Sequence, residues 1–373
     1  MCCLGIYNNY KMSIRIIKQT EFGDLKYHQN YTGDFSWPSN DYVCLSPYIN
    51  TEIRINGNVT VCCPLWNPLV VGNVLEQDLR TIWKGDKIQA IRKSVLNGSY
   101  TFCDQHNCPH IQKHKLALGP VQPKLQMKEE WTAVSETPRH IHFVMDLSCN
   151  LSCPSCRTRR INTITDPEIK EALKVTRSVL DSVFAEPHNE YKMLGMDGSG
   201  EVFHSEVWRE IFNTHPAFTQ IEKWPGLQFE FNTNGTMLTP KYQEKYSHLL
   251  DRAKMVRISV DAGNKNSYEL VRREGDWDQL WINLRALHNR IKPTKTKWCW
   301  NLIIQKNNYR SIPEFVKLAS SFDKRPAIMY TNILDWGQMG DSFQNHAVWR
   351  PDHPEYPELQ RILNLPEVKY YRC

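Results

Sequence analysis

The sequence predicts an α/β protein whose main domain is a partial parallel barrel, and three observations lead to this class. From about residue 139 to about residue 336, short apolar runs alternate with segments of helical periodicity. The alternation contains six strands, which implies a parallel sheet with right-handed crossovers. A closed eight-fold barrel typically needs about 250 residues, and these units occupy only about 200. We therefore expect an open barrel of the (β/α)6 type.

The elements follow in order along the chain. In the helix at 166–184, Asp166 can cap the first turn and Pro167 fits within it. The helix at 311–322 is expected to open with a capping box of Ser311 and Glu314. The predicted strands are 140–146, 192–197, 227–232, 255–261, 297–305 and 327–336, and the other predicted helices are 205–212, 239–250 and 277–291.

Five of the predicted strands carry polar residues at a period of two. A parallel strand covered on both faces is usually apolar on both. Because buried polar groups need partners, these rows indicate a polar barrel interior that holds a ligand, with a satisfied core network as the alternative. The rows are His142 and Asp146; Glu230, Asn232 and Asn234; Arg257, Ser259 and Asp261; Cys299, Asn301 and Gln305; Tyr330 and Asn332.

Composition narrows the functional classes. The 373 residues carry a formal net charge of +6 without a block of Lys and Arg, which does not argue for nucleic-acid binding. No apolar run approaches the ~18 residues of a membrane span, and the N-terminus lacks the order of a secretory signal. We therefore expect a cytoplasmic protein. Its twelve cysteines are clustered, which in a long cytosolic chain indicates metal binding.

The chain is expected to have five segments. A cysteine-containing α+β domain of short strands and turns comes before the barrel, and a stretch with prolines and charges joins the two. The segments are an N-terminal segment at 1–35, the cysteine-containing domain at 36–116, a linker at 117–138, the barrel at 139–340 and a C-terminal tail at 341–373.

Three cysteines with the spacing C-x3-C-x2-C follow the first barrel strand directly: Cys149, Cys153 and Cys156. The carboxyl edge of the strands is where barrels of this type place their active sites. Thiolates at this spacing suit zinc or an iron–sulfur cluster. A structural zinc site needs a fourth ligand, and none is obvious nearby. A [4Fe–4S] cluster held by three cysteines instead has one open iron, which can bind a small ligand.

This arrangement resembles the radical S-adenosylmethionine (SAM) superfamily, whose signature is C-x3-C-x2-C after the first strand. The resemblance implies that Cys149, Cys153 and Cys156 hold a [4Fe–4S] cluster and that SAM chelates its open iron. It also implies that one electron from the cluster cleaves SAM to a 5′-deoxyadenosyl radical, which abstracts a hydrogen atom from the substrate. A flavodoxin or ferredoxin would donate the electron.

Further motifs match the family's pattern between residues 140 and 336. "DGSGEVF" (197–203) resembles the glycine-rich GGE motif, "NTNG" (232–235) the turn after strand three, and "ISVDAG" (258–263) the strand-four segment. "IIQKNNYRSIPEF" (303–315) resembles the strand-five exit near adenine. The chain departs from the pattern at Ser155, where an aromatic residue is common, and at Val202, where proline is. An ordinary βα turn and a core network are the alternative interpretations. The implied SAM-binding residues are Gly198, Ser199, Gly200, Glu201, Asn232, Asn234, Ser259 and Asp261.

The earlier cysteines resemble the SPASM or twitch auxiliary-cluster module. The opening C-x12-G-x4-C consists of Cys44, Gly57 and Cys62, and a Gly at that position suits a hairpin turn. With Cys103 and Cys108, the resemblance implies one auxiliary [4Fe–4S] cluster. A zinc ribbon is the alternative, and Cys63 could replace Cys62. The module usually follows the barrel in the family, whereas here it precedes it.

The module often accompanies peptide modification, so the expected substrate is a peptide or protein side chain. The alternatives are a nucleotide, sugar or RNA substrate, and a non-catalytic zinc or iron–sulfur scaffold. Cys299 and Cys373 could donate a hydrogen atom to a substrate radical. A small buried residue and a chain terminus are their competing interpretations.

Overall fold

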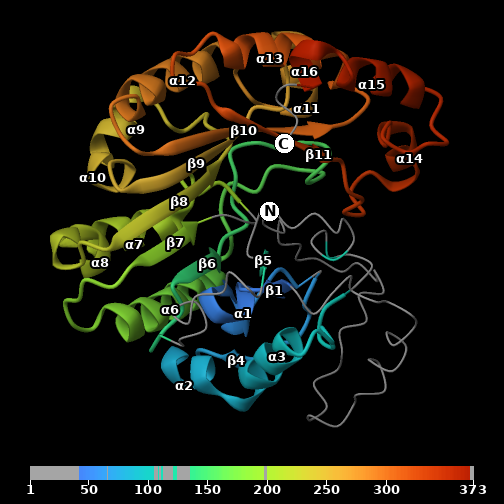
Figure 1. The fold of residues 1–373 in the computed structure, drawn as a ribbon. Helices are drawn as coiled ribbons and strands as arrows, with labels where there is room; N and C mark the ends of the chain where they lie inside the picture. Colours follow the sequence, from blue (N-terminus) through green and yellow to red (C-terminus); the bar gives the residue numbers. More distant parts are fainter. Residues whose placement is uncertain are drawn as a thin grey trace. The chain divides into compact units, whose positions relative to one another are not determined.

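The computed structural model describes residues 42–64, 66–104, 108, 111, 121–123, 135–196 and 200–369. The chain forms two compact units, each built from several segments (Figure 1). We call them unit 1 and unit 2. Unit 1 contains Met1–Met145, Asp166–Gly198 and Thr214–Leu227, and unit 2 contains Asp146–Thr165, Ser199–Asn213 and Gln228–Cys373. This division does not follow the segment boundaries expected from the sequence.

Unit 1 contains a mixed sheet in which the cysteine-containing segment pairs with the first predicted barrel strand. The order is β7–β6–β2–β3–β4, and β2 runs parallel to β6, with Asn50 opposite His140 and Arg54 opposite Val144. β1 pairs antiparallel with β5, which lies inside the expected linker. The strands are β1 Tyr42–Cys44, β2 Asn50–Arg54, β3 Asn58–Thr60, β4 Gly72–Asn73, β5 Val121–Pro123, β6 His140–Val144 and β7 Lys192–Met196.

The helices of unit 1 bury apolar faces. α6 spans Asp166–Phe184, as predicted, and buries Val175, Val179 and Leu180 at helical spacing. At the start of α2, Asp78 accepts a hydrogen bond of 2.7 Å from the Arg80 amide. The other helices are α1 Ser46–Ile49, α2 Leu79–Lys84, α3 Asp86–Leu96, α8 Pro216–Thr219 and the 3-10 turn η4 Ile221–Lys223.

Unit 2 contains four parallel strands, with α9, α12 and α13 along one side of them (Figure 1). The strands are β8 Leu227–Thr233, β9 Ala253–Ser259, β10 Lys297–Ile304 and β11 Ala327–Asn332. The main helices are α7 Glu206–Thr214, α9 Pro240–Lys245, α10 Ser247–Leu250, α11 Lys265–Val271, α12 Trp277–Ile291 and α13 Ile312–Ser320. All six predicted strands are present, and the α/β class with mostly parallel pairing is confirmed.

Strand register explains the polar rows in unit 2. Asn232 on β8 lies opposite Arg257 on β9, which lies opposite Cys299 on β10. One layer further along, Ser259 lies opposite Asn301. On β8 the polar positions are half-buried while the alternate positions are buried. Facing positions in register share one side of a sheet, so these polar side chains form layers on one face of the strands.

The capping box predicted at Ser311 and Glu314 is wrong. The Ser311 hydroxyl donates to the Asn308 carbonyl at 2.8 Å and accepts from the Gly263 amide at 3.0 Å. Glu314 accepts a hydrogen bond of 2.8 Å from Asn264. Both side chains join α13 to the loop after β9 instead of capping the helix. The helix predicted at 239–250 is interrupted at Tyr246, which separates α9 from α10.

The C-terminal tail, for which no element was predicted, packs on α13 and on the loop after β10. Here α15 spans Tyr356–Leu363 and α16 Pro366–Lys369, and both contact α13. The Tyr309 hydroxyl, in the 3-10 turn η5 Tyr309–Ser311, donates to Glu355 and Glu358. The 3-10 turn η6 Gly340–Ser342 and α14 Phe343–His346 come before these helices.

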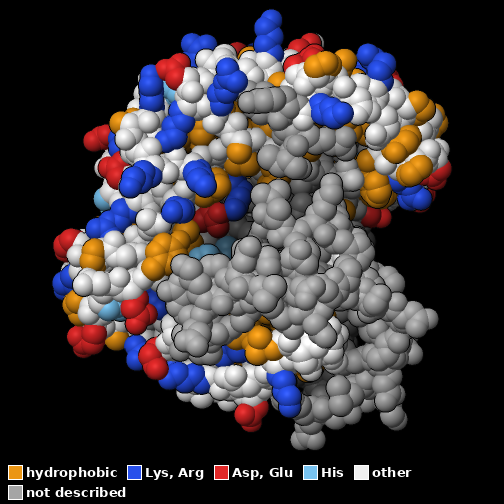
Figure 2. Space-filling view, in the orientation of Figure 1, with side chains coloured by type: hydrophobic (Ala, Val, Ile, Leu, Met, Phe, Trp, Pro, Cys, Tyr) orange, Lys and Arg blue, Asp and Glu red, His pale blue; other side chains and the backbone are white. Residues whose placement is uncertain are grey.

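Basic and acidic side chains are interspersed on the visible surface of unit 2 (Figure 2). Lys265 pairs with Asp278 at 2.7 Å and Arg310 with Glu358 at 2.7 Å. Exposed pairs of this kind contribute little to stability, because water and salt screen them. Within the part of the chain that the structure describes, no helix is both long enough and apolar enough to cross a membrane.

We expect the stability of unit 1 to fall as the pH drops from about 6.5 to about 4, because of His140 at the start of β6. Burial, followed by the nearby His142 and Arg139, lowers the pKa of His140 from 6.5 to about 4. Below pH 6.5 His140 binds a proton in the unfolded chain but stays neutral in the folded one, so acid favours unfolding. Once the pH is below both pKa values, the loss in unfolding free energy is on the order of 3 kcal/mol.

Chemical denaturation of the wild type and of His140→Gln at pH 7, 5.5 and 4 measures this effect. The difference in unfolding free energy between the two proteins should shift in favour of the variant as the pH falls. A difference that stays constant across this range contradicts the assignment.

Candidate metal and cofactor site

The three cysteines lie on the loop that follows β6, in the part of it that belongs to unit 2. The Cys149 amide donates to the Ile161 carbonyl at 2.7 Å, which ties the start of the loop to its end. The amides of Cys156 and Arg157 donate to the Cys153 carbonyl at 2.9 and 3.0 Å. These bonds form a tight turn that holds Cys153 and Cys156 close together.

The three thiols are free and influence one another electrostatically. Burial, and then the nearby Glu201, raises the pKa of Cys149 to about 12, and Cys153 adds to this rise. Burial also raises the pKa of Cys153, an effect that Arg272 opposes and Cys156 reinforces. Thiolates are the form in which cysteines ligate metals. Three cysteines held on one tight loop therefore form a donor set that fits a metal cluster.

Nitrogen donors from three segments point at these sulfurs. The Leu151 amide lies 3.4 Å from Cys149 Sγ, and Asn234 Nδ2 lies 3.7 Å from the same sulfur. Arg272 Nη1 lies 3.6 Å from Cys153 Sγ. Hydrogen bonds to ligating sulfurs stabilise their negative charge and tune the potential of iron–sulfur clusters. Among the described residues, no three His, Cys, Asp or Glu side chains gather at the spacing of a single metal ion.

The backbone of Gly200 packs closely against the backbone of the segment that leads into the cysteine loop. A Cβ atom at this position would lie 2.3 Å from the Ser148 carbonyl oxygen and 2.5 Å from that of Asp146. The next amide, that of Glu201, donates to the Ser148 carbonyl at 2.8 Å. The predicted glycine-rich motif therefore packs directly on the cysteine loop, which explains why only glycine fits.

Glu201 joins the glycine-rich segment to the end of β8. Its side chain is only 2% exposed, and burial raises the pKa of its carboxyl group, which three hydrogen bonds lower in part. The carboxylate accepts from the Thr233 hydroxyl at 2.6 Å, the Asn234 amide at 2.6 Å and the Phe203 amide at 3.2 Å. Glu201 was predicted to bind SAM, but its carboxylate accepts hydrogen bonds from the protein itself.

Asn234 connects β8 to the first cysteine. Besides contacting Cys149, its Nδ2 donates to Asn150 Oδ1 at 2.9 Å. Its Oδ1 accepts from the Thr236 hydroxyl at 2.7 Å, and Asn150 donates to that hydroxyl at 2.8 Å. This closed set of bonds fixes the side chain in place, so Asn234 contacts the ligand loop.

Asp261 follows β9 and pairs with Arg272. Arg272 was not among the residues predicted from the sequence. Asp261 is buried with a left-handed φ of 61°, which is rare for a residue other than glycine. Its Oδ1 accepts from the Ile303 amide at 2.7 Å, and its Oδ2 lies 2.5 Å from Arg272 Nη2. Burial lowers the pKa of Arg272, but Asp261 and then Cys153 raise it, and the net pKa is above the usual value.

Several buried polar atoms around the cysteine loop have no hydrogen-bond partner among the described residues. Ser148 lies next to Cys149, and Tyr268 lies close enough to Cys153 to influence its charge. Such groups are rare in proteins unless a ligand or water satisfies them. The atoms are Ser148 Oγ, Asn232 Oδ1, Tyr268 Oη and Arg272 Nε. They fit a site that binds a polar cofactor.

Of the remaining predicted site residues, two lie in described strands and three lie outside the described residues. Ser259 is half-buried beside Asn301, and Cys299 is buried with its sulfur 3.8 Å from Asn301 Oδ1. Gly198, Ser199 and Cys373 lie outside the described residues.

The four cysteines expected in the auxiliary module come together in unit 1. The Cys103 thiol is influenced electrostatically by each of the other three. Burial raises the pKa of Cys44 to about 11, and the Cys62 thiol interacts with Cys44 and Cys108. Cys63 is disulfide-bonded, which leaves Cys62 as the candidate ligand. Four cysteines whose thiols influence one another electrostatically fit one metal cluster.

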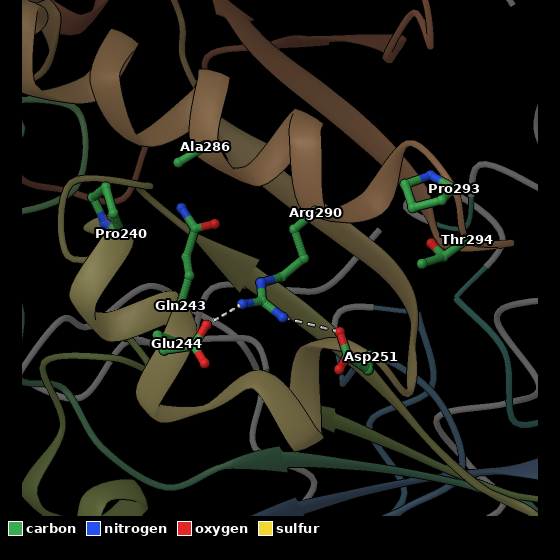
Figure 3. Close-up of a pocket in the computed structure, with 8 residues that line it drawn as sticks. All are labelled: Pro240, Gln243, Glu244, Asp251, Ala286, Arg290, Pro293 and Thr294. Atoms are coloured by element: carbon green, nitrogen blue, oxygen red, sulfur yellow. Dashed lines mark hydrogen bonds and ion pairs between the residues drawn. The ribbon is translucent and has the colours of Figure 1, made fainter.

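A hollow on the surface of unit 2 is separate from these residues (Figure 3). It lies between α9 and α12, and Arg290 crosses it to pair with Glu244 at 2.8 Å and Asp251 at 3.2 Å. Its lining residues are Pro240, Gln243, Glu244, Asp251, Ala286, Arg290, Pro293 and Thr294. None of them is a predicted site residue.

Residues 44–110 match the family model of SPASM, an iron–sulfur cluster-binding domain. The matched segment contains Cys44, Cys62, Cys103 and Cys108, and the match confirms the resemblance predicted for it. No curated protein matches the chain.

Solved structures are similar to parts of the chain. Native anSMEcpe with bound AdoMet and Cp18Cys peptide is 19% identical, with 52% of this chain and 50% of that chain covered and a TM-score of 0.36. The FeFe-hydrogenase maturase HydG from Carboxydothermus hydrogenoformans is 13% identical, with 62% and 52% covered and a TM-score of 0.39. The radical S-adenosylmethionine methyltransferase TsrM from Kitasatospora setae is 11% identical, with 58% and 40% covered and a TM-score of 0.36.

The chain spans about half the length of the first two of these proteins and less of the third. At these identities they do not assign an activity to this chain, so we infer its function from the residues of the site.

Proposed function

We propose that this chain is a radical SAM enzyme that carries an auxiliary iron–sulfur cluster in its SPASM segment. The observation that carries the proposal is the cysteine loop. Its three free thiols influence one another, and Asn234 and Arg272 donate hydrogen bonds to two of them. Cys149, Cys153 and Cys156 would hold a [4Fe–4S] cluster whose fourth iron binds SAM.

When bound, the cluster and SAM supply one-electron reductive cleavage of SAM and an organic radical that abstracts a hydrogen atom from the substrate. The protein's own residues position this chemistry. Gly200 and Glu201 brace the cysteine loop against the end of β8. Asn232 and Ser259 would offer polar atoms to SAM from the layered face of β8 and β9. The glycine-rich segment, which includes Gly198 and Ser199, would bring backbone groups to the same ligand.

The auxiliary cluster would be held by Cys44, Cys62, Cys103 and Cys108. Such a cluster can bind the substrate or accept the electron that an oxidative step leaves behind. We propose a peptide or protein side chain as the substrate, on the basis of the SPASM match. A flavodoxin or ferredoxin in the cytoplasm, where thiols stay reduced, would supply the electron.

Formation of 5′-deoxyadenosine tests this proposal. The protein is reconstituted with iron and sulfide without oxygen, reduced with dithionite and incubated with SAM, and the product is quantified by mass spectrometry. We expect product from the iron-loaded protein and none when either reductant or SAM is left out. Stoichiometric zinc, no bound iron and no product would contradict the proposal and favour a zinc scaffold.

A further inference from the structure

Arg272 is a half-buried cation beside the cysteine loop that no motif predicted. It lies at the end of α11, and its side chain is 12% exposed. One terminal nitrogen donates to Cys153 Sγ at 3.6 Å, and the other lies 2.5 Å from Asp261 Oδ2. The guanidinium therefore bridges a predicted cluster ligand and a buried carboxylate.

Asp261 holds this guanidinium in a fixed direction. Its other carboxylate oxygen accepts from the Ile303 amide, and its backbone carbonyl accepts from Asn308 Nδ2 at 2.7 Å. Its left-handed backbone conformation is costly and persists only where surrounding contacts impose it. Such outliers are concentrated at functional sites, and here the outlier orients the partner of Arg272.

The neighbouring Arg273 holds the same loop from a second side, through oxygen acceptors. Its Nε donates to the Ser152 hydroxyl at 2.9 Å and its Nη2 to the Thr158 carbonyl at 2.9 Å. The Ser152 amide donates back to the Arg273 carbonyl at 3.2 Å. Arg273 therefore fixes the loop's position, which leaves Arg272 to act on the charge of Cys153.

We propose that Arg272 is a positioning residue that sets the reduction potential of the cluster held by Cys149, Cys153 and Cys156. This inference rests on one part of the proposed function, namely that the three cysteines hold a cluster. Reduction adds one electron from an external reductant, and part of the added charge resides on the ligating sulfurs. A hydrogen bond and a half-buried positive charge at Cys153 stabilise the reduced form, so they raise the potential.

Potentiometric titration of the full chain, followed by electron paramagnetic resonance, tests this role. We compare the wild type with Arg272→Gln, which removes the charge, and Arg272→Lys, which keeps it. Arg290→Gln is the matched control, because Arg290 pairs with Glu244 and Asp251 in the surface hollow (Figure 3). The titration is run without SAM, so that it does not depend on cleavage.

At a fixed applied potential, we expect Arg272→Gln to reduce the ratio of reduced to oxidised cluster about tenfold, a shift of about 59 mV to more negative potential. Arg272→Lys should shift less, and Arg290→Gln should titrate as the wild type does. The auxiliary cluster provides an internal reference whose potential should not change.

A titration of Arg272→Gln that coincides with that of Arg290→Gln overturns the inference, whereas the proposed function then stands. If neither Arg272 variant retains iron at the three-cysteine site, the residue holds the loop together, and the inference is again wrong. A wild-type protein without iron overturns both this inference and the proposed function.

Discussion

Simultaneous replacement of Cys149, Cys153 and Cys156 by alanine should remove one of two clusters and leave the other. We expect bound iron to fall from about eight to about four atoms per chain, because each cluster contains four irons. Formation of 5′-deoxyadenosine should fall to the level without SAM, since in the proposed assignment only the three-cysteine site would leave an iron open to bind SAM. Iron and acid-labile sulfide per chain, measured after anaerobic reconstitution, check the expectation.

The reciprocal variant replaces Cys44, Cys62, Cys103 and Cys108 by alanine. It should also lose about four iron atoms but keep the cluster that reacts with SAM. These four thiols and the three-cysteine loop belong to different compact units, which supports separate loss. If either variant loses all of its iron, or if the triple variant still cleaves SAM, the assignment of the two sets is wrong.

Replacing Glu201 by alanine should destabilise the protein by about 3 kcal/mol, because it leaves several buried donors without an acceptor. These donors are the Thr233 hydroxyl and the amides of Asn234 and Phe203. Glu201→Gln keeps the shape and one acceptor oxygen, so it should cost less. Anaerobic urea denaturation, followed by tryptophan fluorescence, gives the free energies of unfolding.

Glu244→Ala is the matched control for Glu201, since the Glu244 side chain is exposed and pairs with Arg290 at the surface. We expect this variant to stay within about 1 kcal/mol of the wild type. Glu201→Ala should also weaken retention of the SAM cluster, because Asn234 contacts both Glu201 and Cys149. An unfolding free energy for Glu201→Ala equal to that of Glu244→Ala contradicts the proposed bracing role.

Local patterns predicted the alternating elements closely. The bounds of α6 at 166–184 and α12 at 277–291 agree with the prediction, because both helices have a strong apolar periodicity and a capping or proline signal at the start. α11 was missed, and with it Arg272. This helix is only seven residues long and buries just Tyr268 and Val271, so its periodicity is too short to detect.

At Ser311 the sequence motif marks the start of the helix, but the side chain does not cap it. Ser-x-x-Glu before an apolar run is typical of a capping box, and the helix does begin at that point. Instead, the Ser311 hydroxyl donates to the Asn308 carbonyl and accepts from the Gly263 amide, which lies 48 positions earlier in the chain. A local pattern cannot include competing partners that the fold brings from other segments.

The α/β class, the position of the three-cysteine loop after a strand and the SPASM resemblance could all be predicted from local patterns, because each depends on spacing within a short stretch of chain. The contacts of Gly200, Glu201 and Asp261 could not be predicted in this way. Their partners, Ser148, Asn234 and Arg272, lie between 11 and 52 positions away along the chain. Contacts of this range depend on strand register and loop packing, which no local pattern encodes.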